Sequence, residues 1–202
     1  MKIKRLFAVI LAACMAFSAG LIGSSAEDAA PTISIKGNFS VLYVGQYVEF
    51  TFGNLTSDME LGILPDSDGN PGKWGVKNYR TGKTGTHRET FKMTDAGTYH
   101  VAVWTTGWNF QTSKKITVEP TPVISGNKRV GVGMNATFNI SGIKSSLEFG
   151  IFPGNDDGSI KSYSVSNYAA VNGDTSRTVS ISEPGNYVAA VWASGWSFVA
   201  QF

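Results

Sequence analysis

Two five-residue segments begin and end with tryptophan: Trp104-Thr105-Thr106-Gly107-Trp108 and Trp192-Ala193-Ser194-Gly195-Trp196. Indole rings bury large areas, and their faces attract the C–H groups of a pyranose ring. Further aromatic and acidic residues recur at matching places: Trp74 and Tyr163, Tyr79 and Tyr168, Glu60 and Glu148. These residues predict a ligand site in which a sugar ring stacks on the aromatic side chains and Glu60 or Glu148 accepts a hydrogen bond.

Two other interpretations of the tryptophan segments stay open. Trp104 could lie over Gly62 and cover a sheet that would otherwise be bare at this point. The same patch could instead contact a protein, because tryptophan is enriched at the energetic centres of protein interfaces. The partner that we expect is therefore a polysaccharide or a cell-surface protein.

Acidic residues also gather in two equivalent loops and are weak candidates for calcium ligands: Asp66 and Asp68, then Asp156 and Asp157. Calcium prefers such oxygen ligands, but Gly69 stands at the fourth position of its loop rather than at the sixth, as an EF-hand requires. An Asp-Gly pair also favours a tight turn. We expect a turn without a metal, and no cofactor.

The histidines give little support for catalysis. His87 has no counterpart in the second copy of the repeat, and Val188 takes the place of His100 there. We expect both histidines to be exposed to solvent. Glycoside hydrolysis needs a pair of suitably spaced carboxylates. The sequence repeats a single glutamate on a strand, with acidic residues only in the loop that follows it. The prediction is a protein that is not an enzyme.

The N-terminal segment has the form of a secretory signal peptide. Lys2, Lys4 and Arg5 precede an apolar run, and small residues end it at Ser24-Ser25-Ala26. We assign residues 1–26 to this signal. The alternative is lipid anchoring at Cys14. The remaining chain has 14 basic and 15 acidic residues, a net charge of −1 that argues against nucleic-acid binding. We expect it to be secreted or attached to the cell surface, without a membrane span.

A repeat of about 88 residues organises the rest of the chain. The segment from Glu60 to Pro65 matches that from Glu148 to Pro153, and Ala102-Val103-Trp104 matches Ala190-Val191-Trp192. This period is too long for a solenoid unit. We predict two tandem domains, at residues 31–119 and 122–202, with a proline-containing linker between them. The last strand of the second domain is predicted to be shortened. The favoured interpretation is a truncated gene or a fragment, and the alternative is a sheet edge that accepts a strand from a partner or another copy.

Alternation of apolar and polar residues predicts that both domains are all-β. In the segment from Tyr99 to Trp104, alternation directs Val101 and Val103 inward and Trp104 outward. The turn with Gly107 is expected to set Trp104 and Trp108 opposite each other. Ile116 and Val118 look like core residues yet share the parity of Trp108. Either Trp108 points inward, or a β-bulge near Ser113 and Lys114 resets the alternation.

The motif Asp95-Ala96-Gly97-Thr98-Tyr99-His100-Val101 resembles the sixth-strand signature of immunoglobulin-like domains, with Val101 in place of the usual cysteine. A weaker copy begins at Glu183. The chain resembles bacterial immunoglobulin-like, or fibronectin-III-like, repeats of secreted and surface proteins. The resemblance implies tandem β-sandwiches in which Tyr99 and Tyr187 are corner tyrosines.

These observations predict a non-catalytic, exported binding or adhesion protein that presents the aromatic faces of its two domains to a carbohydrate or a surface partner. The alternative hypothesis is a structural spacer, the N-terminal remnant of a larger surface protein or enzyme.

Overall fold

The computed structural model describes residues 29–37 and 41–202, and the predicted signal peptide and Cys14 lie outside them. The described residues form strands and loops and contain no helix that could cross a membrane. The strands are β1 (Thr32–Ile35), β2 (Leu42–Tyr43), β3 (Tyr47–Leu55), β4 (Glu60–Ser67), β5 (Asn70–Pro71), β6 (Lys77–Thr81), β7 (Gly85–Lys92), β8 (Gly97–Thr105), β9 (Asn109–Glu119), β10 (Val123–Gly126), β11 (Asn135–Ser141), β12 (Leu147–Pro153), β13 (Ser166–Val171), β14 (Thr175–Ser180), β15 (Tyr187–Ala193) and β16 (Ser197–Gln201).

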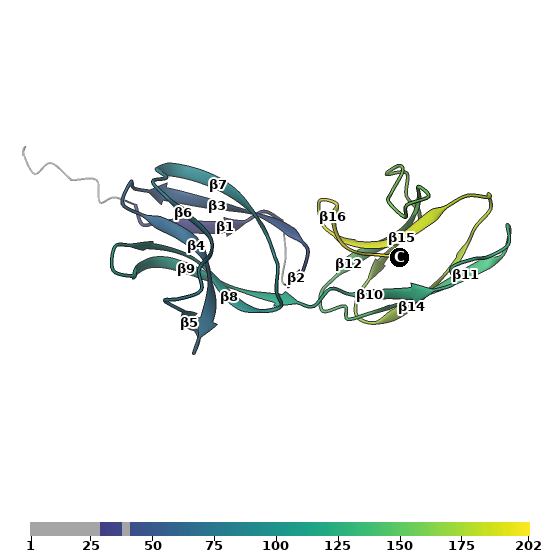
Figure 1. The fold of residues 1–202 in the computed structure, drawn as a ribbon, viewed down its shortest axis with the longest axis horizontal. Helices are drawn as coiled ribbons and strands as arrows, with labels where there is room; N and C mark the ends of the chain where they lie inside the picture. Colours follow the sequence, from purple (N-terminus) through teal and green to yellow (C-terminus); the bar gives the residue numbers. More distant parts are fainter. Residues whose placement is uncertain (1–28, 38–40) are drawn as a thin grey trace, which may run out of the picture.

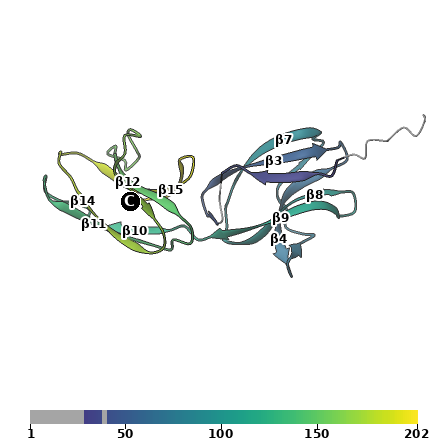
Figure 2. The same cartoon turned by 180° about the vertical axis from the view of Figure 1, so that it is seen from behind.

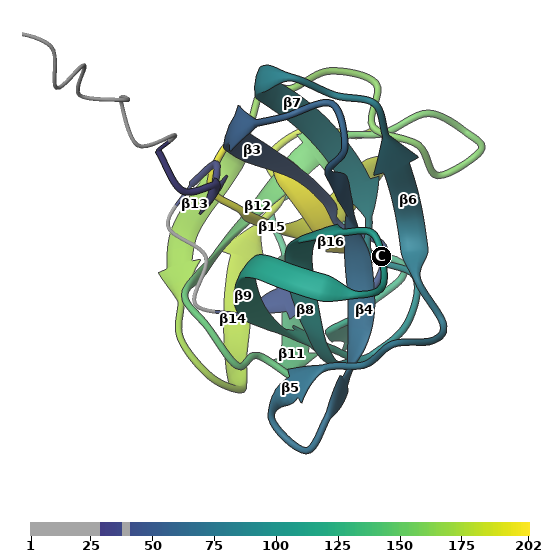
Figure 3. The ribbon, with the colours of Figure 1, turned by 90° about the vertical axis from the view of Figure 1, so that its left-hand side faces the viewer.

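The first half of the described chain, residues 29–119 without the gap at 38–40, is built from two facing sheets. Strands β1, β3 and β7 form one sheet, and β2, β9, β8 and β4 form the other, with β5 and β6 paired to β4. Figure 2 shows β3 and β7 on one side of this half and β8, β9 and β4 on the other. Seen end-on in Figure 3, β6 lies at the margin between the two sheets.

Alternation builds the core of this first half. In β3, Val48, Phe50 and Phe52 are buried while the residues between them are more exposed. They pack against Val101 and Val103 of β8, from the opposite sheet. Each fully buried side chain of this kind contributes about 1.5–3 kcal/mol of burial free energy. The period of two therefore places the core between the sheets.

The second half, residues 122–202, repeats the arrangement with strands β10, β11 and β14 in one sheet and β13, β12, β15 and β16 in the other. Phe138, Phe149 and Val191 lie in its core. The Tyr187 hydroxyl donates to the Glu183 carbonyl at 3.0 Å, which is the corner bond that the resemblance implied. Tyr99 instead lies beneath the ammonium of Lys77, which is 5.4 Å from its ring centre.

The predicted fold class is confirmed. The described chain is all-β, and its sheets face each other with mostly antiparallel neighbours. In the first half, β3 and β7 lie in one sheet while β4, β8 and β9 lie in the other, which is the strand partition of an immunoglobulin-like sandwich.

Tyr43 connects the two halves, which lie end to end along the long axis of the molecule in Figure 1. Its ring is fully buried and belongs to the core of the second half. Its hydroxyl accepts hydrogen bonds from the backbone N–H groups of Lys144 at 2.7 Å and Ser145 at 3.0 Å. The Thr121 hydroxyl adds a bond of 3.1 Å to the Val44 carbonyl. A side chain of the first half thus fixes the position of a loop of the second.

Candidate functional site

The tryptophans of the predicted site gather on the outer face of one sheet in each half, in clusters separate from the core. In the first half, Leu64, Ala102 and Trp104 form a buried cluster that is separate from the main core. The prediction that Trp104 points outward from the sandwich is therefore confirmed. However, Trp104 is only 1% exposed, because neighbouring side chains cover it. Trp192 lies in the same way in the second half.

Trp108 supplies much of this cover, because its ring stacks on Trp104. The ring centres are 5.5 Å apart with an angle of 18° between the planes, and Trp196 stacks on Trp192 at 5.3 Å and 7°. The expectation that Trp104 and Trp108 would be cross-strand partners is wrong. Trp104 pairs with Phe110, and Trp108 lies in the turn with a left-handed backbone, φ 62°. This backbone conformation folds its ring back over Trp104.

Trp108, Ile116 and Val118 all have even numbers, although Trp108 lies on the outer face and the other two lie in the core. A β-bulge in β9 explains the difference. The ladder pairs Val103 with Thr112 but Trp104 with Phe110, so Gln111 is the extra residue. Of the two alternatives that parity allowed, the bulge is the one found. It lies two residues before the predicted position, and its effect is to return Ile116 and Val118 to the core.

Glycine forms the floor under each buried tryptophan. A Cβ atom added to Gly62 would lie 2.9 Å from Val76 Cγ1 and 3.4 Å from the Trp104 ring. The equivalent atom on Gly150 would overlap Val165 and lie 3.0 Å from Trp192. Trp104 and Trp192 therefore cover bare backbone, as the structural interpretation proposed. They form the base of the aromatic face and are not available to touch a ligand in this conformation.

The exposed part of each aromatic face comes from rings around this base. Trp74 is 80% exposed and meets Trp108 edge-on, with the ring centres 6.2 Å apart at 60°. Tyr163 is 68% exposed and meets Trp196 at 6.2 Å and 71°. Each half therefore presents two aromatic rings at a steep angle to one another. Tyr79 and Tyr168 lie on the other side of the base and are also exposed.

The two predicted acceptor carboxylates lie beside these rings but already have partners. Glu60 accepts a hydrogen bond from the Trp104 indole N–H, and Glu148 accepts one from the Tyr168 hydroxyl at 2.9 Å. That bond to Glu148, together with burial, raises the pKa of Tyr168. Burial and the Glu60 carboxylate raise the pKa of Tyr79. Both tyrosines therefore stay protonated at neutral pH, and Tyr168 donates its one hydroxyl proton to Glu148.

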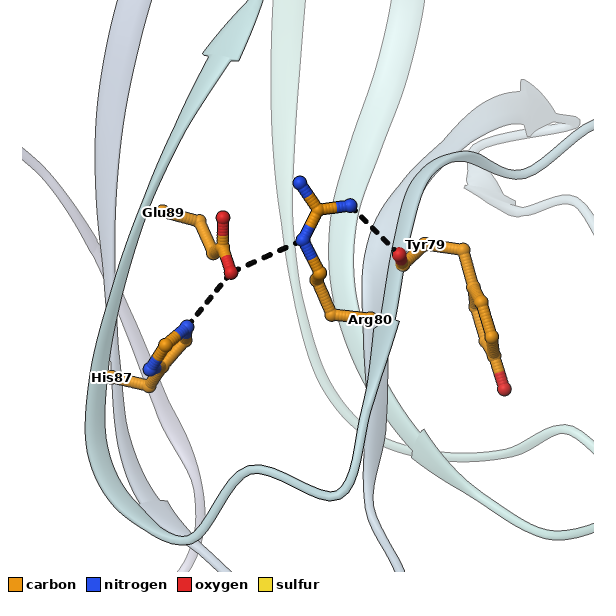
Figure 4. Close-up of polar contacts among 4 residues, drawn as sticks. All are labelled: Tyr79, Arg80, His87 and Glu89. Atoms are coloured by element: carbon orange, nitrogen blue, oxygen red, sulfur yellow. Dashed lines mark hydrogen bonds and ion pairs between the residues drawn. The ribbon is translucent and has the colours of Figure 1, made fainter.

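A polar cluster attaches β6, and with it Tyr79, to the opposite sheet. Figure 4 shows Glu89 of β7 between His87 and Arg80, with the Tyr79 ring pointing away. Glu89 lies 2.8 Å from His87 Nε2 and 3.2 Å from Arg80 Nε, and Arg80 also donates to the Tyr79 carbonyl. Burial favours the protonated form of Glu89, but the His87 bond and the Arg80 charge outweigh it and lower its pKa. The ionised Glu89 thus orients the strand that carries Tyr79.

The acidic loops are held by hydrogen bonds of the protein itself. Asp66 accepts from the Gly69 N–H and lies 2.7 Å from His100 Nε2, while Asp157 accepts from Ser159. Asp156 accepts from Asn186, and Asp68 has a left-handed backbone in its turn. In the described part of the chain, no three His, Cys, Asp or Glu side chains group as metal ligands would. The expectation that His100 is exposed is wrong, since it is buried against Asp66.

Sequence reasoning missed several residues that complete the two faces. Phe110 and Phe198 pack edge-on or tilted against the stacked tryptophans, and Val76 and Val165 lie against the glycine floor. Asn78 and Asn167 have left-handed backbones one residue before Tyr79 and Tyr168. All three pairs recur at equivalent positions, so the repeat itself carried the signal.

Comparisons with known proteins leave the family open. No family model matches the chain, and no curated protein matches it. Among solved structures, it is similar to a human OSCAR ligand-binding domain at 13% identity and a TM-score of 0.35, over 85% of this chain and 94% of that one. A chain of a cytokine receptor complex matches at 12% identity and 0.36, over 85% and 99%. Salmonella alpha-2-macroglobulin reacted with methylamine matches at 15% identity and 0.31, over 87% and 14%. Likeness at this level says nothing about a ligand.

Proposed function

We propose that this chain is a non-catalytic, exported binding protein whose two aromatic faces contact carbohydrate. The observation that carries the proposal is a pair of steeply angled rings in each half: exposed Trp74 with half-buried Trp108, and exposed Tyr163 with exposed Trp196. In this arrangement, a pyranose stacks on the face of one ring and its edge contacts the second ring. Export rests on the signal-peptide pattern of residues 1–26.

The buried tryptophans support this proposal through rigidity. Rings that are already fixed by stacking lose little side-chain freedom when a ligand binds, so more of the contact energy is retained. Trp74 is highly exposed although it is a large apolar side chain. Exposed apolar surface that recurs at the same place in both halves is typical of a contact surface. The polar ends of Tyr79 and Tyr168 provide hydrogen-bonding groups at the border of each face.

Removal of the exposed rings tests the carbohydrate proposal. Affinity electrophoresis on a panel of plant and cell-wall polysaccharides should show retardation of the wild-type protein by at least one glycan. The double variant Trp74→Ala, Tyr163→Ala should weaken that binding about tenfold or more, because each ring contributes roughly 1 kcal/mol or more of contact. Trp104→Ala is a poor test, since it removes the base of the face.

Val123→Ala provides the control. Val123 is an exposed apolar side chain on β10, in the sheet opposite the aromatic face of the second half, so its loss should leave retardation unchanged. Circular dichroism should confirm that every variant is folded. Carbohydrate binding is excluded if no polysaccharide retards the wild type, or if the double variant is retarded as strongly as the control.

One observation favours the second candidate, a structural spacer. Tyr43 fixes the junction between the halves through a buried ring and two backbone hydrogen bonds. A spacer needs such a stiff joint, because a flexible one would not hold its ends apart. The glycan measurement separates the two candidates, since a spacer binds none of the polysaccharides.

A further inference from the structure

The aromatic face of the second half adjoins the first half at the start of β3. The hydroxyl of Ser197, the residue after Trp196, donates to the Tyr47 carbonyl at 3.5 Å. Trp196 is 49% exposed and Tyr47 is 62% exposed. The turn that carries Trp196 therefore lies beside a strand end that carries another exposed aromatic residue. This contact joins the edge of the aromatic face to the first half.

The two sheets that meet here lie on the same side of the molecule. In both Figure 1 and Figure 2, β3 and β7 of the first half and β12 and β15 of the second half lie above the long axis. β12 and β15 belong to the sheet whose outer face carries Trp192, with Trp196 stacked on it. The outer surface of the sheet formed by β1, β3 and β7 therefore continues the aromatic face of the second half.

Positive side chains lie on this continuation. In the ladder between β3 and β7, Tyr47 pairs with Lys92 and Thr51 pairs with Arg88. The Lys92 ammonium lies 5.6 Å from the centre of the Tyr47 ring. Phe91 of the same strand is buried in the core, so alternation directs Lys92 and Arg88 to the outer surface, where both are exposed. The two cations are four residues apart, or about 13 Å along the strand.

No carboxylate neutralises these two cations. Within the described part of the chain, neither Arg88 nor Lys92 forms an ion pair. Glu49 shares their outer surface but binds Lys36 at 3.5 Å. Glu89 of the same strand instead binds Arg80 and His87 at the margin between the sheets. This surface therefore has an excess of positive charge, which attracts anions.

We propose that the aromatic face of the second half and the basic track formed by Tyr47, Lys92 and Arg88 together bind one anionic polysaccharide. Its sugars carry carboxylate or sulfate groups. This inference rests on the proposed carbohydrate-binding function and names its substrate class. One sugar stacks on the rings of Tyr163 and Trp196, and a following unit contacts Tyr47. The anionic groups meet Lys92, which acts as a point charge, and Arg88, which offers paired N–H donors.

The carboxylate of Glu148 favours this path for the sugar chain. Glu148 accepts the hydrogen bond of Tyr168, on the other side of the buried base from Tyr163. An anionic group bound beside Glu148 would be repelled, whereas one bound beside Lys92 is attracted. The polysaccharide therefore runs from Trp196 toward Tyr47 rather than toward Tyr168.

Matched pairs of polysaccharides test the charge requirement. The probes are polygalacturonate with its carboxyl-reduced form, and dextran sulfate with dextran, so carboxylate and sulfate are tested separately. Calorimetric titration of the full chain should show that at least one anionic member binds about fivefold or more tightly than its neutral partner, because two exposed cations each add a modest attraction. This preference should shrink as the ionic strength rises from about 0.02 M to about 0.2 M. Equal binding within both pairs would overturn the proposal.

Two double variants locate the site of the anionic groups. Arg88→Gln with Lys92→Gln removes both charges of the basic track and should abolish the preference for the anionic member. Lys128→Gln with Arg129→Gln removes two charges from the exposed loop after β10 and should retain the preference of the wild type. All four side chains are exposed, so both variants should keep the circular dichroism spectrum of the wild type. An identical preference in the two double variants contradicts the proposal.

Contact with the sugar is tested separately from charge. Poly-L-glutamate carries carboxylates without sugar rings, so it should bind more weakly than the preferred anionic polysaccharide. Tyr163→Ala should weaken binding of that polysaccharide, because the stacked sugar loses part of its contact. If poly-L-glutamate binds equally well, or if Tyr163→Ala has no effect, charge alone holds the ligand and the proposal fails.

The inference and the proposed function fail in different ways. If no polysaccharide binds, the proposed function fails and the inference fails with it. If Tyr163→Ala weakens binding of a neutral polysaccharide but neither anionic probe is preferred, the inference fails alone.

Discussion

The left-handed backbones of Trp108 and Trp196 are the most informative single-residue feature of the aromatic faces. Both have φ near 60°, a region that large side chains avoid, at a cost of about 1–3 kcal/mol for each residue. The stacking of each ring on its buried partner offsets this cost. The same strain occurs in both halves. We therefore infer that the stacked position of the Trp108 and Trp196 rings, and not the turn alone, determines this left-handed backbone conformation.

At the same scale, the contacts of Asp66 lead us to expect that the stability of the protein falls at acidic pH. The hydrogen bond with His100, and then those with Gly69 and Lys115, lower the pKa of Asp66. A carboxyl group with a lowered pKa in the folded state stabilises the protein above its unfolded pKa, near 4, and loses this effect as the pH falls. We expect the melting temperature of the wild type to fall more steeply between about pH 5 and pH 3 than that of Asp66→Asn.

Asp68→Asn is the matched control for this prediction. Asp68 lies in the same turn with a left-handed backbone, which asparagine also tolerates. Its melting curve should follow the wild type at every pH. Parallel pH dependences for the wild type and Asp66→Asn would show that the interaction with His100 contributes nothing.

At the scale of the element, a bulge in β6 lies opposite the glycine floor. Between the pairs Leu61–Arg80 and Ile63–Lys77, β4 contributes one residue, Gly62, while β6 contributes two. The strand β13 carries the same extra residue opposite Gly150 of β12. Gly62 has Val76, the Lys77 carbonyl and the Trp104 ring close to the place of a Cβ. A side chain here would have to displace β6 or the tryptophan.

Gly62→Ala should therefore destabilise the protein by about 1–3 kcal/mol, the usual range for overpacking. Urea denaturation measures the loss of stability. The tryptophan emission should shift to the red, because displacement of Trp104 admits water to its ring. Thr106→Ala, in the exposed turn of the neighbouring hairpin, should change neither quantity. An unshifted spectrum with full stability would mean that the floor can accommodate a methyl group.

The sequence was sufficient to predict which strand residues face the core and which face outward. Alternation in β3 and β8 correctly separated inward from outward residues, because the residues of one face of each strand pack into the core between the sheets. Alternation does not reveal what covers an outward residue. Trp104 and His100 are both outward and both buried, one under Trp108 and the other against Asp66. Those covers depend on turn conformations and on loops from other strands, which a local pattern does not contain.

At the scale of the whole molecule, the repeat predicted that the two halves would resemble each other, but it gave no sign of the joint between them. Gly131 stands at the position equivalent to Tyr43. A comparison of the copies therefore had no counterpart from which to infer the role of Tyr43. A large aromatic residue without a partner in the other copy was the available signal.

Tyr43→Phe tests the joint. Phenylalanine keeps the ring but removes the acceptor of two backbone N–H groups, so we expect a loss of about 1 kcal/mol. Urea denaturation should also show less coupling, with the halves unfolding over a broader range. Tyr47→Phe, at an exposed tyrosine, should leave the transition unchanged. A transition identical to the wild type would mean that the hydroxyl does not couple the halves.

The same joint determines how strongly two weak contacts, one on each aromatic face, reinforce each other when a single ligand makes both. When a ligand such as a long polymer chain has bound one half, the concentration that the second half experiences is determined by the distance and angle between the two faces. A stiff joint makes this effective concentration high for ligands that match the spacing and near zero for those that do not. Tyr43, although it lies outside both faces, would thereby select ligands by the length of their repeating unit.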